Sequence, residues 1–163
     1  MKHILLNLKR FDIPAEYGGV NRLASVNTWA KTIVEGTQQE LAKYNHGLVE
    51  FIQFFPESHL LSAQAALRAN SPIQIGCQGI FREDSAPGGN FGAFTSNRPA
   101  AAAQALGCRS VLIGHCEERN DMAGIMTEGG GNANCDAVNR LLNKEIKAAQ
   151  SRGLKVVYCI GEK

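Results

Sequence analysis

Long hydrophobic runs are absent from this 163-residue sequence. No stretch approaches the ~18 consecutive apolar residues of a candidate membrane-spanning helix, which excludes a membrane-embedded function. The few apolar residues of Met1–Leu8 are followed at once by Lys9 and Arg10, so this segment is too short for a secretory signal peptide. We therefore expect a cytoplasmic protein that has no membrane partner.

A strong excess of charge of one sign is also missing. The chain has 17 Lys and Arg against 15 Asp and Glu, which gives a formal net charge of +2. Surfaces that bind the phosphates of nucleic acids usually carry a clear basic surplus, so we expect no nucleic-acid partner. Any anionic ligand must be held by a few local side chains.

Cysteines with metal-ligand spacing are missing as well. The five cysteines are an odd number, stand at positions 77, 108, 116, 135 and 159, and form no Cys-x-x-Cys motif. Disulfide frameworks and structural zinc sites depend on paired or closely spaced cysteines. We expect reduced thiols and no metal.

What is present is the composition of a globular protein, with 44% hydrophobic and 20% charged residues. Five short aliphatic runs predict strands at Ile4–Leu8, Val49–Phe55, Ile73–Ile75, Ser110–Ile113 and Lys155–Ile160. The runs are continuous rather than alternating, which is typical of parallel strands that are covered on both faces.

Segments with helical spacing separate these strands. The clearest apolar stripe consists of Val138, Leu141, Leu142, Ile146 and Ala149, with Gly153 as a stop signal. Further helices are predicted over Ser58–Ala69, over Pro99–Leu106 and within Asn21–Tyr44, where the apolar face would consist of Leu23, Val26, Trp29, Ile33 and Leu41. The alternating order predicts an α/β protein with a parallel sheet. Phe81–Thr95 and Asn120–Asn134 are expected to be long loops.

Polar side chains follow the predicted strands at their carboxyl ends, where parallel α/β folds bind their ligands. These residues are Asn7, Lys9, Gln78, His115, Glu117 and Glu162. Lys9 taken alone is typical of a solvated lysine, and His115 taken alone is as typical of a structural histidine as of a catalytic one. Their occurrence at matched strand ends indicates a site.

These strand-end residues are able to stabilise an oxyanion. A lysine ammonium beside an asparagine attracts an anionic substrate, and a glutamate can fix that lysine by an ion pair. A neutral His115 can donate a hydrogen bond to a carbonyl oxygen that becomes an enediolate. No residue of the set is a clear base for removing a proton from carbon.

The segment Gly114-His115-Cys116-Glu117-Glu118-Arg119 resembles the Gly-His-Ser-Glu-Arg-Arg motif of the triosephosphate isomerase family. Asn7-Leu8-Lys9 is similar to the Asn-x-Lys motif of that family after its first strand. Further matches are Gln78, Gly92-Ala93-Phe94-Thr95 and Cys159-Ile160-Gly161-Glu162-Lys163. Five motifs in the family's order make the resemblance specific.

The resemblance implies a fold and an activity. The fold would consist of parallel (β/α) units of a TIM barrel, incomplete with about five of eight strands, as a single partial domain over residues 1–163. The activity would be that of an isomerase of glycolysis and gluconeogenesis, which interconverts a ketose phosphate and an aldose phosphate through an enediolate without a cofactor. The partner would be a small phosphorylated sugar, and the assembly a homodimer.

The resemblance also implies residue roles. His115 would be the electrophile. Asn7 and Lys9 would bind substrate, and Glu117 would pair with the catalytic Lys9. The residues that would support the site are Gln78, Cys159, Glu162 and Thr95, the last of which would cross the dimer interface. Departures from the family pattern are Cys116 for Ser, Glu118 for Arg, Arg10-Phe11 for Met-Asn, and a loop enlarged over residues 85–90. These departures leave the exact sugar phosphate and the dimer contacts open.

The family's base glutamate, lid and phosphate-gripping loops follow strand six and later strands, so we expect them beyond residue 163. The chain as given is therefore expected to be inactive by itself. Two alternatives stay open: a truncated, inactive half-barrel that serves as an assembly or binding module, and a flavodoxin-like ligand-binding domain. The length suits the latter better than a barrel of ~200 or more residues, but Phe11–Gly19 lacks its Gly-x-Gly-x-x-Gly loop.

Overall fold

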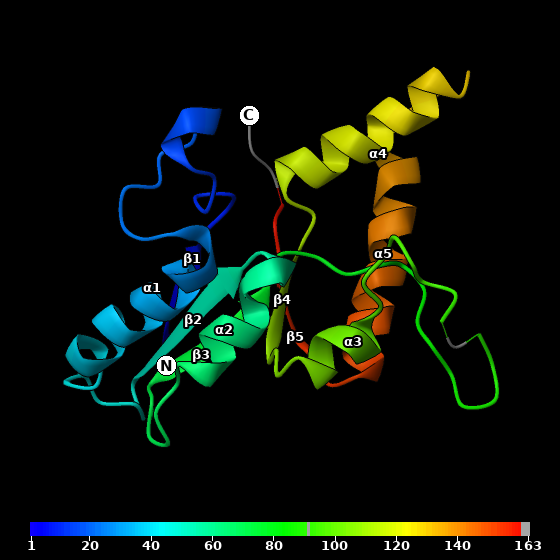
Figure 1. The fold of residues 1–163 in the computed structure, drawn as a ribbon. Coiled ribbons are helices and arrows are strands. Elements are labelled where there is room, and N and C mark those ends of the chain that lie inside the picture. Colours follow the sequence, from blue (N-terminus) through cyan, green and yellow to red (C-terminus); the bar gives the residue numbers. More distant parts are fainter. Residues whose placement is uncertain (91, 161–163) are drawn as a thin grey trace. The chain divides into compact units, whose positions relative to one another are not determined.

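The computed structural model describes residues 1–90 and 92–160. Its five strands are β1 (Lys2–Asn7), β2 (Val49–Phe55), β3 (Ile73–Cys77), β4 (Ser110–Ile113) and β5 (Lys155–Tyr158). They form one sheet in the order β1-β2-β3-β4-β5 (Figure 1). This sequential order confirms the parallel units of a barrel. The flavodoxin-like alternative is wrong, because a doubly wound sheet reverses its strand order at a switch point.

In the described residues, five α-helices lie between the strands. They are α1 (Val26–Leu41), α2 (Leu60–Ala65), α3 (Ala100–Ala105), α4 (Cys116–Glu128) and α5 (Cys135–Ser151), with 3₁₀ turns η1 (Ala15–Tyr17) and η2 (Glu57–His59). None of the helices in the described ranges combines the length and the apolar character that crossing a bilayer requires.

The chain divides into two compact units. The first consists of Met1–Gln78 and Leu106–Ser110, and the second consists of Gly79–Ala105 and the chain from Val111 onward. We describe each unit by itself.

The first unit is built on β1, β2 and β3, which pair in parallel with Leu5 opposite Ile52 and Gln53 opposite Ile75. Its core is apolar and includes Phe54 and Phe55, both fully buried. Trp29 of α1 contacts the ring of Phe55 edge-on, with 5.9 Å between ring centroids. Helices α1 and α2 lie side by side (Figure 1).

Strand β1 differs from the prediction that every strand is covered on both faces. It pairs with β2 among the described strands, and Ile4, Leu5 and Leu6 are 52%, 44% and 45% exposed. An edge strand has one paired side, so its apolar side chains lack the neighbours that bury β2. The apolar run therefore predicts a strand correctly, but the prediction that this strand is buried is wrong.

The apolar face predicted for α1 is also partly wrong. Leu23 precedes the helix and is 59% exposed, and Val26 is 38% exposed. The helix begins at Val26 after Ser25, and its buried face consists of Trp29, Ala30, Val34 and Gln38. The helix continues through Gly36 without a break.

Helix α5 of the second unit confirms its prediction. Asn134 caps the helix by accepting a hydrogen bond from the Ala137 N–H at 2.8 Å, while Val138 and Leu142 are buried. Gly153 follows the helix with φ +68°, a left-handed conformation that glycine adopts at little cost.

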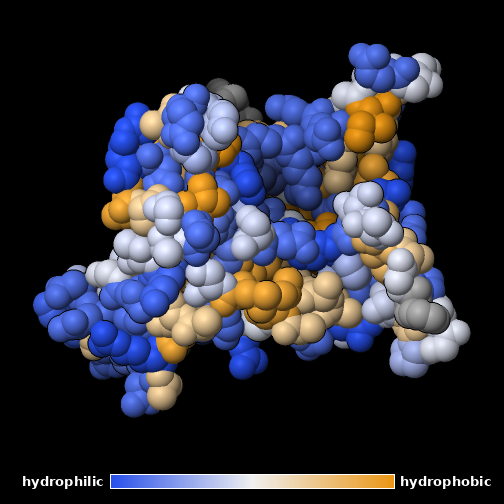
Figure 2. Space-filling model, in the orientation of Figure 1, coloured by the Kyte–Doolittle hydropathy of each residue, from blue (hydrophilic) through white to orange (hydrophobic). Residues whose placement is uncertain are grey.

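Helix α4 corrects the expectation of a loop over Asn120–Asn134. The helix runs to Glu128, and the loop is confined to the glycine-rich segment that follows. It has no buried residue among its 13, and Figure 2 shows apolar side chains on its visible surface. A helix without a buried stripe produces no 3.6-residue periodicity, so sequence reasoning had no signal for it.

The enlarged Phe81–Thr95 loop is fastened at its first residues. Asp84 Oδ1 accepts a hydrogen bond from the Ala101 N–H at 3.0 Å, at the start of α3, and its carboxylate also pairs with Arg152. Burial raises the pKa of Asp84, but the hydrogen bonds from Ala101 and Arg152 outweigh it and leave the pKa below its usual value. The beginning of the loop is therefore part of the packed unit.

Candidate functional site

Asn7, Lys9 and Gln78 share one hydrogen-bond network in the first unit. Asn7 Oδ1 accepts the Lys9 N–H at 3.0 Å and the Gln78 Nε2 amide at 3.1 Å. Gln78 Nε2 also lies 3.0 Å from Lys9 O and 3.3 Å from Phe54 O. The amide of Gln78 therefore ties the end of β3 to the ends of β1 and β2.

Lys9 has an unusual backbone conformation, with φ +40°. A non-glycine residue in this region costs about 1–3 kcal/mol unless its surroundings hold it there. The Asn7 side chain supplies such a contact, because its oxygen accepts the Lys9 N–H as in an Asx turn. The following residues are anchored as well, since Asp12 Oδ2 lies 2.9 Å from the buried His59 Nε2. Lys9 thus stands on a backbone that is fixed on both sides.

His115 lies in the second unit at the junction of β4 and α4. Gly114 before it has φ +82°, and His115 is the N-cap residue of α4. Its Nδ1 lies 3.3 Å from Glu117 Oε2 and 3.6 Å from Cys116 Sγ. The two neighbouring side chains lie side by side because the helix begins at Cys116.

Arg119 holds the turn around His115. Its guanidinium donates to Gly114 O at 2.7 Å, to Cys159 O at 3.0 Å and to Asn139 Oδ1 at 2.8 Å. It also donates to the hydroxyl of Tyr158 at 2.8 Å. One side chain thereby joins the start of α4 to the end of β5 and to α5. The sequence motif contains Arg119 as its last residue, which is a signal for a structural role, but the motif alone does not predict these four contacts.

A pair of carboxyl groups lies behind the same turn. Glu118 Oε2 accepts the Gly114 N–H at 2.5 Å, and Glu145 of α5 is only 4% exposed. Burial and, to a lesser extent, the neighbouring Glu118 carboxylate together raise the pKa of Glu145 to about 9, against the opposing charge of Arg82. Burial also raises the pKa of Glu118, against hydrogen bonds from Gly114 and Glu145 and the charges of Arg119 and His115. Glu145 therefore keeps its proton at neutral pH and donates it to Glu118.

The other predicted residues are placed as follows. Thr95 is exposed at a turn that the Asn97 N–H closes onto Phe94 O at 3.0 Å. Cys159 is half-buried, and its N–H donates to Ile113 O at 2.9 Å. Glu162 lies outside the described residues. The structure thus gathers Asn7, Lys9 and Gln78 in one unit, and His115, Glu117 and Cys159 in the other.

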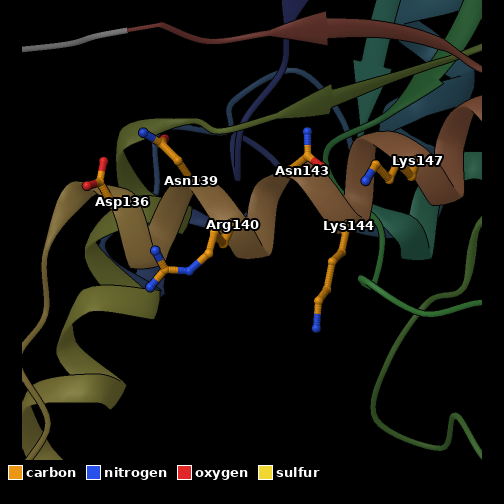
Figure 3. Close-up of a pocket in the computed structure, with 6 residues that line it drawn as sticks. All are labelled: Asp136, Asn139, Arg140, Asn143, Lys144 and Lys147. Atoms are coloured by element: carbon orange, nitrogen blue, oxygen red, sulfur yellow. The ribbon is translucent and has the colours of Figure 1, made fainter.

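Hollows on the described part of the second unit include the following two. One of about 550 Å³ follows the exposed face of α5, where Figure 3 shows Arg140 and Lys144 pointing one way and Asn139 and Asn143 the other. All its residues come from this helix, so its cations diverge instead of converging on a ligand. The other, of about 370 Å³, lies beside Arg119 and is lined by Cys116 and Tyr158 among others. Within the described ranges, no three potential metal ligands cluster.

Comparisons with known proteins bear on these motifs. The family model of triosephosphate isomerase matches residues 22–163. Triosephosphate isomerase of Chloroflexus aurantiacus is 33% identical over 107 residues, which cover 66% of this chain and 35% of the relative. That of Pseudomonas syringae pv. tomato is 31% identical over 133 residues, covering 79% of this chain and 47% of the relative.

The fold also matches a solved structure. The crystal structure of triosephosphate isomerase from Bartonella henselae superimposes with a TM-score of 0.61 at 20% identity, over 99% of this chain and 52% of that one. The chain spans between a third and a half of the length of the curated relatives quoted above. The extent of the family match and the order of the motifs lead to one conclusion: the chain belongs to the triosephosphate isomerase family.

Proposed function

We propose that this chain supplies the substrate-binding and electrophilic residues of a triose-phosphate isomerase. Asn7 and Lys9 bind the phosphorylated substrate, and His115 polarises its carbonyl group. Glu117 pairs with Lys9 and fixes its position by charge, as the family resemblance implies. The base that removes the proton from carbon is a glutamate expected beyond residue 163, as are the loops that grip the phosphate.

The observation that carries the proposal is the position of His115 at the N-cap of α4 in a chain that belongs to this family. A neutral histidine at a helix N-terminus is the established electrophile of triosephosphate isomerases. As the substrate loses a proton from carbon, its carbonyl oxygen gains negative charge, and a hydrogen bond from the imidazole N–H becomes stronger. The Lys9 ammonium stabilises the same charge. No cofactor takes part in this chemistry.

The departures of this chain modify the surroundings of His115 and not the histidine itself. Cys116 Sγ lies 3.6 Å from His115 Nδ1, so the nitrogen that would face substrate is Nε2. Arg119, which matches the family's last motif residue, holds Gly114 O at 2.7 Å. These contacts support the assignment of a fixed imidazole.

Isomerisation of a triose phosphate tests the proposal. The product of the complete coding sequence is purified, and its length is established by intact mass spectrometry. We expect turnover that falls by about 10²–10³ in His115→Gln, the scale of losing one oxyanion donor. The control is His46→Gln, which changes an exposed histidine. Equal rates for His115→Gln and the unchanged protein would refute the role of His115.

A second function is favoured by strand β1. Its apolar residues Ile4, Leu5 and Leu6 are all more than two-fifths exposed, and an exposed apolar edge strand tends to pair with another chain. This favours an assembly or binding module for a product of 163 residues. Such a product should sediment as an oligomer and should show no isomerisation; a soluble monomer at high concentration contradicts this function.

A further inference from the structure

The carboxyl group of Glu118 contacts the backbone that carries His115, and the side chain of Glu145 is hydrogen-bonded to Glu118. Glu118 Oε2 accepts the N–H of Gly114, the residue directly before His115, at 2.5 Å. Glu145 is 4% exposed, and its Oε2 is buried with no hydrogen-bond partner in the described part of the chain. Two ionised carboxylates at this position would repel each other in a poorly solvated place, so the arrangement requires a proton between them.

The surrounding charges are arranged unequally. Arg119 acts on Glu118, while Arg82 acts on Glu145. The Gly114 N–H also donates to Glu118, which is half-buried, whereas Glu145 is buried. The ionised form is therefore favoured at Glu118, which leaves the proton on Glu145.

We infer that Glu118 and Glu145 form a proton-sharing pair that positions His115 by holding the Gly114 N–H, and that loss of the shared proton releases this turn. The step is a simple ionisation. The O–H bond of Glu145 breaks, the proton passes to solvent base, and both carboxylates are left negative. Repulsion then moves Glu118, whose oxygen withdraws from the Gly114 N–H.

This pair deepens the proposed function and rests on it for the catalytic meaning of His115. The geometric claim itself concerns only Gly114, Glu118 and Glu145. Glu118 and Glu145 are positioning residues, because neither is placed against the substrate. The turn would be fixed at pH values below the ionisation of Glu145 and would loosen at higher pH.

Amide hydrogen exchange and chemical shift of Gly114 test the inference without substrate. In ¹⁵N-labelled protein between pH 6 and 10, we expect the Gly114 amide proton to lie downfield at neutral pH. Its shift should change with a midpoint near 9, the pKa of Glu145, and its protection factor should fall at least tenfold across this step. Glu145→Gln keeps a donor toward Glu118 but cannot ionise, so the step should disappear.

Two further variants make the result decisive. Glu118→Ala removes the acceptor and should lower the Gly114 protection factor at least tenfold at neutral pH, while amides of α5 such as Leu142 report whether the unit is still folded. Glu128→Gln changes an exposed glutamate of α4 and should leave the Gly114 step in place. The same Gly114 titration in Glu145→Gln as in the unchanged protein overturns the inference. If the titration is observed but His115→Gln isomerises normally, the pair stands and the proposed function fails.

Discussion

Replacing Glu145 by glutamine should change how stability depends on pH. The folded protein raises the pKa of Glu145 from 4.5 to about 9, so between these values the folded state binds a proton that the unfolded state has lost. Stability contributed by this group is therefore complete below pH 4.5 and is lost as pH rises toward 9. One proton corresponds to a slope of about 1.4 kcal/mol per pH unit.

The expected size follows from that slope. Between pH 5.5 and 8.5 the unchanged protein should lose up to about 4 kcal/mol of unfolding free energy relative to Glu145→Gln, because the glutamine cannot ionise in either state. Taking the difference between the two proteins removes the contributions of the titrating groups that do not interact with Glu145. The difference in unfolding free energy should shift in favour of Glu145→Gln as pH rises.

Urea denaturation followed by circular dichroism at pH 5.5, 7.0 and 8.5 measures this difference. Glu128→Gln serves as the matched control, because it removes an exposed carboxylate from the same region. Its curve should run parallel to that of the unchanged protein. Parallel curves for Glu145→Gln would refute the reasoning, since they would mean that Glu145 ionises alike in the folded and unfolded states.

Three further substitutions test the first unit. Gly76→Ala places a Cβ 2.5 Å from ring atoms of the fully buried Phe54, and we expect a loss of about 1–3 kcal/mol in urea unfolding from overpacking. Gly36→Ala, where nothing lies within 4 Å, should instead stabilise α1 by about 0.5–1 kcal/mol. Gln78→Leu removes the hydrogen bonds to the ends of β1 and β2 and should lower the free energy of unfolding by about 1–3 kcal/mol. The control Gln150→Leu changes an exposed glutamine and should lower it little. Equal losses in the two variants would contradict the role of Gln78.

The strands were predictable because short hydrophobic runs are read directly from the chain. Predicted and observed bounds agree for β2 and β4; β3 and β5 differ by two residues at one end, and β1 starts two residues earlier and ends one residue earlier than predicted. The exposure of β1 was not predictable, because burial depends on which other strands lie beside a strand. Nothing in the run Ile4-Leu5-Leu6 distinguishes an edge strand from a central one.

The candidate site was predictable in its residue types and less so in its contacts. Motif spacing placed His115 after β4 and Asn7 and Lys9 after β1, as the structure has them. It did not show that the Gln78 amide would contact the side-chain oxygen of Asn7 and the backbone oxygens of Lys9 and Phe54. These contacts join residues that are 71, 69 and 24 positions apart, and a single sequence contains no signal for them.

For Glu145, the sequence predicts burial but does not identify the partner. Glu145 stands seven residues after Val138 and three after Leu142, on the buried face of α5. A glutamate in that place is costly unless it is neutralised or paired, so the sequence already indicated an altered ionisation. The partner was hidden, because α4 has no buried stripe from which a packed helix could be predicted. A charged residue at a buried position of a periodic helix therefore predicts that a titrating pair exists, while only the fold identifies its second member.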